Sequence, residues 1–303
     1  MKTDQPVFLS EEQVREHLPM KELIPAMEKA LIDFSAGKVT QPVRSVISID
    51  PPGGFLGLMP AAAPDGVGLK AVTFYPSNAE RGIPTHMATI LLVDKETGAP
   101  LAIMDGRLIT EMRTAAVSAA ATNLLVSPDA KILGILGSGV QARSHMEALL
   151  LVRRFDEIRV WSPTRDHAKQ FAAEIGATAM SAEEAVYNAD VIVTATSSQT
   201  PVLRGAWQKT GCHVNAVGAC RPDWRELDDA AMSNVVFVDS REGAMKESGD
   251  VILSSAKIYA ELGEALAGKV SPRAGETTIF KSLGMAVEDI AAASLVYRSF
   301  TKL

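Results

Sequence analysis

The sequence has few of the residues that mark several classes of protein. Only two of its 303 residues are cysteines, Cys212 and Cys220. Two thiols are too few for a disulfide framework, and neither belongs to a Cys/His cluster of the kind that binds structural zinc. We therefore expect no metal site and a reducing compartment. Aromatic residues make up only 5% of the chain, which gives little support for a surface that stacks on bases.

Positive charge is also scarce, because 30 Lys and Arg residues stand against 36 Asp and Glu residues, for a net charge of −6. A nucleic-acid partner usually requires a basic face, so we expect none. No segment reaches the roughly 18 consecutive apolar residues that span a bilayer. Residues 1–6 contain an acid and a proline where a signal peptide would have its apolar run. We expect a cytoplasmic protein with no membrane partner.

Hydrophobic residues make up 47% of the chain and charged residues 22%, which is enough for a large core and argues against disorder. At roughly 150 residues per domain, the length suggests two domains. The first part is predicted to be of the α+β type, with a helix that Ser10 caps and a second helix over 21–36 that ends at Gly37. Its predicted strands span 45–49, 55–59, 69–74, 89–93 and 101–104, and the last two form a hairpin.

The pattern changes after an alanine-rich helix predicted over 110–125, and we expect a domain boundary near residue 120. From there, short apolar strands alternate with helices, which favours an α/β domain with a parallel sheet and helices on both faces. The predicted strands span 132–136, 158–161, 191–195, 213–217 and 235–238. The predicted helices span 140–152 and 165–175, and a last helix spans 285–300 and is expected to return to the first domain.

A glycine turn with the pattern G-x-G-x-x-A follows the strand at 132–136 and opens the helix at 140–152. Gly137 permits the tight turn, Gly139 lets the backbone approach a pyrophosphate, and Ala142 lets helix and strand pack closely. The N–H groups at the helix start favour phosphates. We expect dinucleotide binding here, the alternative being a structural turn. The expected contacts are Gly137, Ser138, Gly139, Val140 and Gln141.

The end of the next strand selects between the two nicotinamide dinucleotides. An acid there accepts a hydrogen bond from the ribose 2′-hydroxyl of NAD, whereas a nearby arginine suits the 2′-phosphate of NADP. The chain has Ser162, Pro163, Thr164 and Arg165 and no acid before Asp166. This favours NADPH. The alternative is NADH, in which case Arg165 is a solvated helix residue. Ser162, Thr164 and Arg165 are the expected contacts.

Several longer stretches carry a resemblance to a known family. The most specific are 221–227, 246–250 and 280–289, and shorter ones are 41–44, 72–75, 104–106, 113–119 and 215–219. On these residues the chain resembles the ornithine cyclodeaminase/mu-crystallin family over nearly its full length. The resemblance implies a substrate-binding and dimerisation domain of the α+β type at 1–120, to which a C-terminal helix at 283–303 returns. It also implies a Rossmann-type dinucleotide-binding domain at 121–282 and a homodimer.

The resemblance further implies NAD(P)H-dependent reduction of cyclic ketimines that bear a carboxylate. Arg44 and Arg113 match family residues that clamp the substrate carboxylate, a task that suits a planar guanidinium. A structural salt bridge is the alternative for Arg113, which lies in a helix of Ala and Val. Lys70 matches a family lysine near the substrate, although an isolated lysine is usually solvated. Glu247 matches a residue that faces the ligand, and a loop charge is its alternative.

The remaining expected cofactor contacts come partly from the resemblance and partly from the ends of strands. Thr85 and His86 match a pair near the nicotinamide, although a lone histidine is more often structural. Arg113 and Ser282 match further contacts. The other expected contacts follow strand ends, where ligands bind in parallel sheets. They are Thr196, Ser197, Val217 and Cys220, and Cys220 could equally be a small packing residue.

Two departures from the family pattern affect the expected activity. Cyclodeaminases have a catalytic aspartate where this chain has Cys220, and a thiol does not replace that acid. Related reductases have an Asn-Arg pair for the 2′-phosphate where this chain has Ser162 and Pro163. We therefore expect an imine reductase whose substrate takes its proton from solution. The alternatives are a cyclodeaminase, an opine- or alanine-type dehydrogenase and a thyroid-hormone-binding protein.

Overall fold

The computed structural model describes residues 5–51 and 53–302 and consists of two compact units. Unit 1 contains Met1–Arg113 and Met285–Leu303, and unit 2 contains Thr114–Gly284. The division falls inside helix α3 (Arg107–Leu125), as does the boundary expected near residue 120. The interpretation of residues 1–4 as lacking the apolar run of a signal peptide lies outside the described residues.

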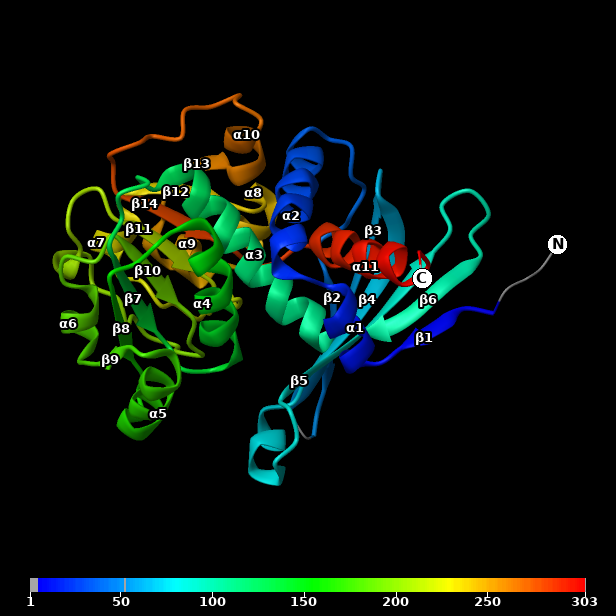
Figure 1. Cartoon of the computed structure of the whole chain (residues 1–303), viewed down its shortest axis with the longest axis horizontal. Coiled ribbons are helices and arrows are strands. Elements are labelled where there is room, and N and C mark those ends of the chain that lie inside the picture. Colours follow the sequence, from blue (N-terminus) through cyan, green and yellow to red (C-terminus); the bar gives the residue numbers. More distant parts are fainter. Residues whose placement is uncertain (1–4, 52, 303) are drawn as a thin grey trace. The chain divides into compact units, whose positions relative to one another are not determined.

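Unit 1 contains a six-stranded sheet in the order β1-β6-β5-β4-β3-β2 (Figure 1). Its strands are β1 (Val7–Leu9), β2 (Ser45–Ile49), β3 (Gly54–Ala63), β4 (Gly66–Phe74), β5 (His86–Val93) and β6 (Pro100–Asp105). The five strands from β2 to β6 form an antiparallel ladder. All five were predicted, and so was the β5–β6 hairpin. The parallel edge strand β1 was not, because three residues are too few to show alternation.

The described part of unit 1 also contains four helices, of which α1 and α11 contact the sheet. They are α1 (Glu11–His17), α2 (Met20–Ser35), the 3₁₀ helix η1 (Pro76–Arg81) and α11 (Ala286–Phe300). Ser10 caps α1 through a reciprocal pair of hydrogen bonds with Gln13, and Gly37 has a left-handed φ of 72° after α2. Both signals were predicted. Helix α11, red in Figure 1, packs against α2 and against β3 and β4.

Unit 2 contains an eight-stranded sheet in the order β13-β12-β14-β11-β10-β7-β8-β9, and every neighbouring pair is parallel. Its strands are β7 (Ile132–Leu136), β8 (Glu157–Trp161), β9 (Thr178–Ala179), β10 (Val191–Thr194), β11 (His213–Ala216), β12 (Val235–Val238), β13 (Ile258–Glu261) and β14 (Thr278–Lys281). This confirms the predicted parallel sheet. The strands β9, β13 and β14 were missed, although β14 lies in the middle of the sheet.

The helices of unit 2 lie on both faces of its sheet. They are α4 (Val140–Val152), α5 (Arg165–Ile175), α6 (Ala182–Val186), α7 (Asp229–Met232), α8 (Arg241–Glu247), α9 (Gly249–Ser254), α10 (Leu262–Leu266) and the 3₁₀ helix η2 (Gly205–Trp207). On one face, Met146 of α4 and Phe171 of α5 belong to the same buried cluster as Ile135. A second buried cluster includes Leu136 and Val214. Because successive strand residues point to opposite faces, these two clusters confirm an α/β unit of three layers.

The strand order of unit 2 reverses between β7 and β10. From β7 the chain proceeds outward to β8 and β9, and from β10 it proceeds to β11 in the opposite direction. Open parallel sheets bind ligands outside the carboxyl ends of their strands at such a switch point. The topology therefore places a ligand-binding region at the loops that follow β7 and β10.

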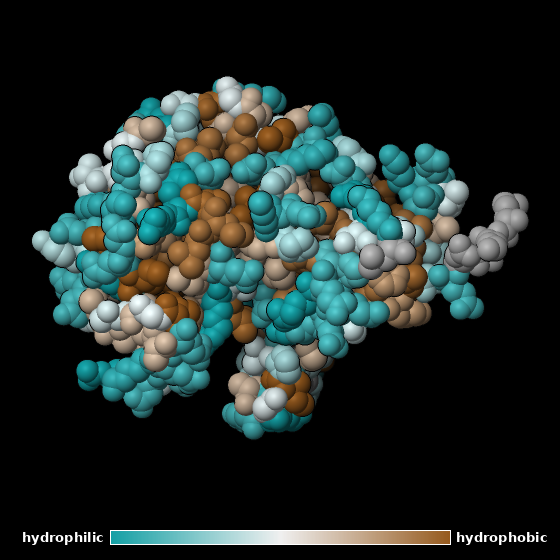
Figure 2. Space-filling model, in the orientation of Figure 1, coloured by the Kyte–Doolittle hydropathy of each residue, from teal (hydrophilic) through white to brown (hydrophobic). Residues whose placement is uncertain are grey.

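The surface combines polar and apolar residues. Figure 2 shows hydrophilic and hydrophobic residues interspersed over the face in view. Scattered apolar residues of this kind are normal for a protein surface. Across residues 5–51 and 53–302, no helix has the length and apolar character needed to cross a membrane.

Candidate functional site

The glycine turn of unit 2 lies directly between β7 and α4, as predicted. Gly137 has a φ of +137°, and a Cβ placed on it would lie 2.5 Å from the carbonyl oxygen of Ala195. Glycine is therefore required for the turn to approach the end of β10. Its backbone N–H donates to Trp161 O at 2.8 Å, which fixes the turn to the end of β8. Ala142 is fully buried and belongs to the same cluster as Leu133 and Ile135 of β7, which agrees with the close packing of helix and strand expected there.

The start of α4 fits a phosphate group. Gly139 is the N-cap residue, and a Cβ on it would have no atom within 4 Å, so the space that a side chain would fill is open. No side chain of the described residues caps this helix start. The N–H groups of its first turn and the helix dipole therefore favour an anion. The Arg143 guanidinium donates to the carbonyl groups of Ser138 and Gly139, and these hydrogen bonds stabilise the turn.

The end of β8 contacts the same turn. The hydroxyl groups of Ser138 and Ser162 lie 2.9 Å apart. Thr164 is the N-cap residue of α5, but its side chain makes no capping hydrogen bond. Arg165 lies exposed in the first turn of that helix. A second helix start thus presents backbone N–H groups beside an arginine, an arrangement that suits a phosphate.

The other expected contacts of unit 2 also follow strand ends. Thr196 and Ser197 follow β10, Val217 and Cys220 follow β11, and Ser282 follows β14. Because β14, β11, β10, β7 and β8 are neighbours in a parallel sheet, these residues meet along the same edge as the glycine turn. Ser197 and Cys220 are exposed there, and Cys220 Sγ lies 3.6 Å from Val217 O.

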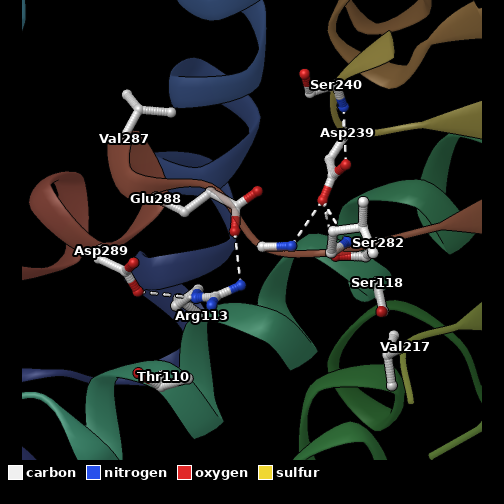
Figure 3. A network of polar contacts seen from close by, with 12 residues as sticks. Thr110, Arg113, Ser118, Val217, Asp239, Ser240, Ser282, Val287, Glu288 and Asp289 are labelled. Atoms are coloured by element: carbon white, nitrogen blue, oxygen red, sulfur yellow. Dashed lines mark hydrogen bonds and ion pairs between the residues drawn. The ribbon is translucent and has the colours of Figure 1, made fainter. Parts of the chain in front are cut away.

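The loop of Ser282 is held by a buried carboxylate, Asp239, which follows β12. Asp239 Oδ2 accepts hydrogen bonds from Leu283 N at 2.6 Å, from Gly284 N at 2.8 Å and from Ser282 Oγ at 3.3 Å (Figure 3). Its other oxygen accepts from Ser240 N at 2.8 Å. Backbone N–H groups that donate to a buried carboxylate are fixed in direction, so the position of Ser282 is well defined.

Unit 1 contains a buried cluster of four charged side chains. Arg113 of α3 donates to Asp289 Oδ1 from Nε at 3.0 Å and to Glu288 Oε2 from Nη1 at 2.8 Å (Figure 3). Lys70 of β4 lies 2.6 Å from Asp289 Oδ2. Asp289 therefore bridges both cations. All four side chains are at most 5% exposed, which is rare for charged residues unless they are paired.

Burial and neighbouring charges shift the pKa values of the groups in and beside the cluster. Burial lowers the pKa of Lys70 to about 8 against the attraction of Asp289, and the charges of Arg113 and Arg44 lower it further. Burial favours the neutral form of Asp289, but Lys70 and Arg113 hold its pKa below the usual value. Burial, together with Lys70 and Arg113, lowers the pKa of His86 to about 4. His86 is therefore neutral at pH 7 beside a positive potential.

Three cations gather around the two carboxylates of the cluster. Lys70, Arg113 and the half-buried Arg44 carry three positive charges, against the two negative charges of Glu288 and Asp289. Lys70 also donates to Thr110 Oγ1 at 3.4 Å. Within the described parts of the chain, Asp289 and Thr110 are its acceptors, which leaves the third ammonium hydrogen for a ligand.

The segment that carries Arg44 is tied to the same helix start. Gln41 Oε1 accepts a hydrogen bond of 2.9 Å from Val287 N in the first turn of α11. Gln41 thus anchors the stretch 41–44 beside Glu288 and Asp289. The structure brings together three of the four expected catalytic residues in unit 1, namely Arg44, Lys70 and Arg113. The fourth, Glu247, ends α8 in unit 2 and is half-buried there.

Thr85 and His86 are the other expected cofactor contacts of unit 1, and His86 lies close enough to Lys70 and Arg113 for their charges to lower its pKa. His86 begins β5 and pairs with Phe74, and the half-buried Thr85 accepts a hydrogen bond of 2.8 Å from Tyr75 N through its carbonyl oxygen. The alternative of a solvated lysine does not apply to Lys70, because Asp289 pairs with it inside the unit.

Sequence reasoning missed several functional groups. Glu288 and Asp289 are two acids at the start of an otherwise apolar helix, and this contrast could have marked them as partners of Arg113. Glu226 and Asp250 were missed as well, because they stand among charged and polar residues in the sequence. Arg143 follows the glycine pattern directly, but no spacing rule indicates that it contacts the turn.

Comparison with known proteins identifies the family. The model of the ornithine cyclodeaminase/mu-crystallin family matches residues 4–302. The chain belongs to this family. The resemblance seen in the sequence motifs is thereby confirmed.

Individual relatives are similar over nearly the whole chain. The ketimine reductase mu-crystallin of Mus musculus is 51% identical over 306 residues, which cover 98% of each protein. The structure of Thermococcus litoralis Δ1-pyrroline-2-carboxylate reductase, solved in complex with NADH and L-proline, is 37% identical with a TM-score of 0.93 and covers 98% of each chain. An archaeal alanine dehydrogenase dimer with bound NAD is 33% identical with a TM-score of 0.93, over 98% of this chain and 96% of that chain. These likenesses confirm the expected fold class.

Proposed function

We propose that this protein is an NAD(P)H-dependent reductase of cyclic imines that carry a carboxylate beside the imine carbon. The observation that carries this proposal is the buried cluster of Lys70, Arg113, Glu288 and Asp289, on whose Lys70 the charge of Arg44 also acts. Support comes from the relatives, which include a ketimine reductase and a pyrroline-2-carboxylate reductase.

The residues of unit 2 fit a dinucleotide. The open start of α4 suits the pyrophosphate, and Gly137 and Gly139 let the backbone approach it. Related structures hold NADH or NAD. When bound, the reduced nicotinamide supplies a hydride to the imine carbon. Thr196, Ser197, Val217, Cys220 and Ser282 are proposed to surround it, and Thr85, His86 and Arg113 are proposed as contacts from unit 1.

The residues of unit 1 bind and orient the substrate. Arg113, Arg44 and Lys70 hold the carboxylate, so the imine carbon has a fixed orientation, and orientation supplies much of the rate in such reactions. The substrate takes its proton from solution, because an iminium ion forms in water and His86 is neutral at pH 7. Glu247 is proposed to contact the ligand. No strong general acid is needed.

Cys220 separates this activity from cyclisation with loss of ammonia. The family's cyclodeaminases place an aspartate at this position, and a thiol does not serve as that acid. We expect no ammonia release from ornithine. The test is an ammonia assay with oxidised cofactor and ornithine, and sustained release would assign the protein to the cyclodeaminases instead.

We propose NADPH as the preferred cofactor. The end of β8 has no acid for a ribose 2′-hydroxyl, whereas the uncapped start of α5 and Arg165 suit a 2′-phosphate. Arg165→Ala should raise the KM for NADPH about threefold to tenfold and leave the KM for NADH unchanged, because an exposed phosphate contact is of modest strength. Equal changes for both cofactors would contradict this assignment.

We also propose a homodimer formed through unit 1. Val46 and Ile47 of the edge strand β2 are each 53% exposed, and unpaired apolar edges favour association with another chain. A related dehydrogenase is a dimer. Ile47→Glu should shift the protein toward the monomer in light-scattering chromatography, and an unchanged mass would contradict the proposed surface.

The activity is tested with a panel of ring substrates. Five- and six-membered cyclic imine carboxylates, with and without ring sulfur, are mixed with NADPH or NADH, and loss of cofactor absorbance is followed. Pyruvate with ammonia serves as the arm for an alanine-type dehydrogenase. We expect turnover with at least one cyclic imine. Turnover only in the pyruvate arm, or in none, would contradict the proposal.

A further inference from the structure

One buried carboxylate in unit 2 holds the ends of two neighbouring strands. Glu226 Oε1 accepts hydrogen bonds from Thr196 N and Thr196 Oγ1, each at 2.7 Å. Its Oε2 accepts from Thr194 Oγ1 and from Gly218 N, each at 2.8 Å. Thr194 ends β10 and Thr196 follows it, whereas Gly218 follows β11. Glu226 itself is fully buried.

Both oxygens of Glu226 act as acceptors, although burial and the nearby Asp250 raise the pKa of this carboxyl. Backbone N–H groups only donate, so Thr196 N and Gly218 N each need an acceptor, and they contact different oxygens of Glu226. An amide in this place would have only one oxygen, and its NH₂ group would face one of the two donors. Gly218 allows the close approach, because a Cβ on it would lie 2.4 Å from Glu226 Oε1 and 2.2 Å from Thr196 O.

A second buried carboxylate fixes Glu226 in turn. Asp250 Oδ1 accepts hydrogen bonds from Glu226 N at 2.7 Å and from Leu227 N at 2.9 Å. Asp250 Oδ2 lies 2.9 Å from Lys281 Nζ, and both side chains are fully buried. Lys281 belongs to β14, the neighbour of β11. The network therefore links the ends of β10, β11 and β14, and its members restrain one another.

The strands that Glu226 joins belong to one side of the switch point. The glycine turn and the end of β8 take the adenosine half of a dinucleotide, because the glycine pattern and the ribose selector lie there. The other half then lies across the reversal, beside β10 and β11. Glu226 has no role in the reaction steps described above, and it reaches the cofactor only through the loops it holds.

We propose that Glu226 is a positioning residue that sets the loops after β10 and β11 for the nicotinamide half of the cofactor. This inference rests on the proposed use of a nicotinamide dinucleotide and not on the identity of the imine. Glu226 should therefore affect the binding of the nicotinamide half of the cofactor and not that of the adenosine half.

The test compares two probes on the full-length protein without any imine. NADPH reports binding of the whole cofactor, and adenosine 2′,5′-bisphosphate reports its adenosine half; NADH and ADP replace them if the wild-type protein prefers NADH. Glu226→Gln should weaken NADPH binding about tenfold or more, because one buried N–H loses its acceptor. It should change adenosine bisphosphate binding by less than about twofold.

Matched variants keep the test decisive. Glu183→Gln removes an exposed acid from α6 and should leave both affinities unchanged. Thr194→Val removes only one donor to Glu226 and should weaken NADPH binding about twofold to fivefold, whereas Thr194→Ser should restore it. If Glu226→Gln does not fold, the Thr194 pair decides by the same measurement.

Two results would overturn the inference. One is unchanged NADPH binding in Glu226→Gln. The other is an equal loss for both probes, which would show that Glu226 supports the unit as a whole. Failure of the wild-type protein to bind any nicotinamide dinucleotide would instead reject the proposed function, so the two failures are distinguishable.

Discussion

Both units bury carboxylates, but these carboxylates hold different kinds of group. In unit 1, Asp289 and Glu288 hold the side-chain cations Lys70 and Arg113. In unit 2, Glu226 accepts hydrogen bonds from the backbone N–H groups of Thr196 and Gly218 and from threonine hydroxyls. The carboxylates of unit 1 keep two cations buried, whereas Glu226 fixes the positions of the loops that follow β10 and β11.

This difference matches two binding tasks. A small anionic substrate needs cations that its carboxylate can pair with. A long cofactor needs many contacts from a rigid edge, because each loop supplies only a few. Replacing a carboxylate of unit 1 should therefore change the charge of the cluster and the stability of the protein. Replacing Glu226 in unit 2 should change the positions of the loops that it holds.

The largest effect is expected for Asp289→Asn. This change leaves Lys70 and Arg113 buried without their shared carboxylate, and breaking such a pair costs about 3–5 kcal/mol. Urea unfolding followed by circular dichroism should show the loss. Glu80→Gln on the exposed surface of η1 is the control. A loss below about 1 kcal/mol would show that the cluster is not strongly coupled.

Arg113→Ala should lower kcat/KM by about 100-fold or more. It should raise KM and lower kcat together, because the guanidinium both binds and aligns the substrate. The matched control is Arg107→Ala, which removes an arginine from the same helix that pairs with Glu11 and Glu111 and is 25% exposed. An unchanged kcat in Arg113→Ala, or an equal effect in both variants, would contradict the assigned role.

Acid should weaken unit 2 through two buried histidines. Burial lowers the pKa of His145 and of His213 to about 4, whereas the unfolded chain binds these protons near pH 6.5. Because the unfolded state binds more protons between these values, stability falls as pH decreases from about 6.5 toward about 4. The expected loss between pH 7 and pH 5 is roughly 2 kcal/mol for each histidine.

Tryptophan fluorescence reports this loss for unit 2 alone, since Trp161, Trp207 and Trp224 all belong to it. His145→Gln should reduce the difference between pH 7 and pH 5 by about half, and the exposed His167→Gln should not change it. Equal stability at both pH values in the wild-type protein would contradict the burial argument.

The smallest effect concerns the affinity for an anion at high pH. Lys70 is charged below its pKa of about 8 and neutral above it. A cyclopentanecarboxylate inhibitor keeps its charge throughout, so its inhibition constant should rise by up to about tenfold per pH unit above pH 8. Lys70→Arg should move this rise to higher pH, because arginine stays protonated. A constant inhibition constant from pH 7 to pH 10 would exclude Lys70 from anion binding.

Much of the fold could be predicted because local patterns and tertiary structure agree. The strand β7, the helix α4 and the turn between them were predicted with the observed bounds, since the apolar run, the glycines and the small Ala142 all indicate the same structure. The antiparallel ladder of unit 1 was predicted from strand and turn residues in the same way.

The rest depended on partners distant in the sequence. Strand β14 ends in Lys281, a residue that disfavours a central strand until Asp250 pairs with it. Lys70 was selected only through the resemblance for the same reason, because its partner Asp289 lies 219 positions later in the chain. Charge pairs of this kind have no periodicity, so the sequence pattern alone does not identify them.

The central claim is that buried cations in unit 1 recognise the carboxylate of a cyclic imine. It is tested most directly by comparing kcat/KM for pyrroline-2-carboxylate with that for pyrroline, the same ring without its carboxylate, with NADPH in excess. The account predicts that removing the carboxylate lowers kcat/KM by about 100-fold or more. Similar values for the two rings would contradict it.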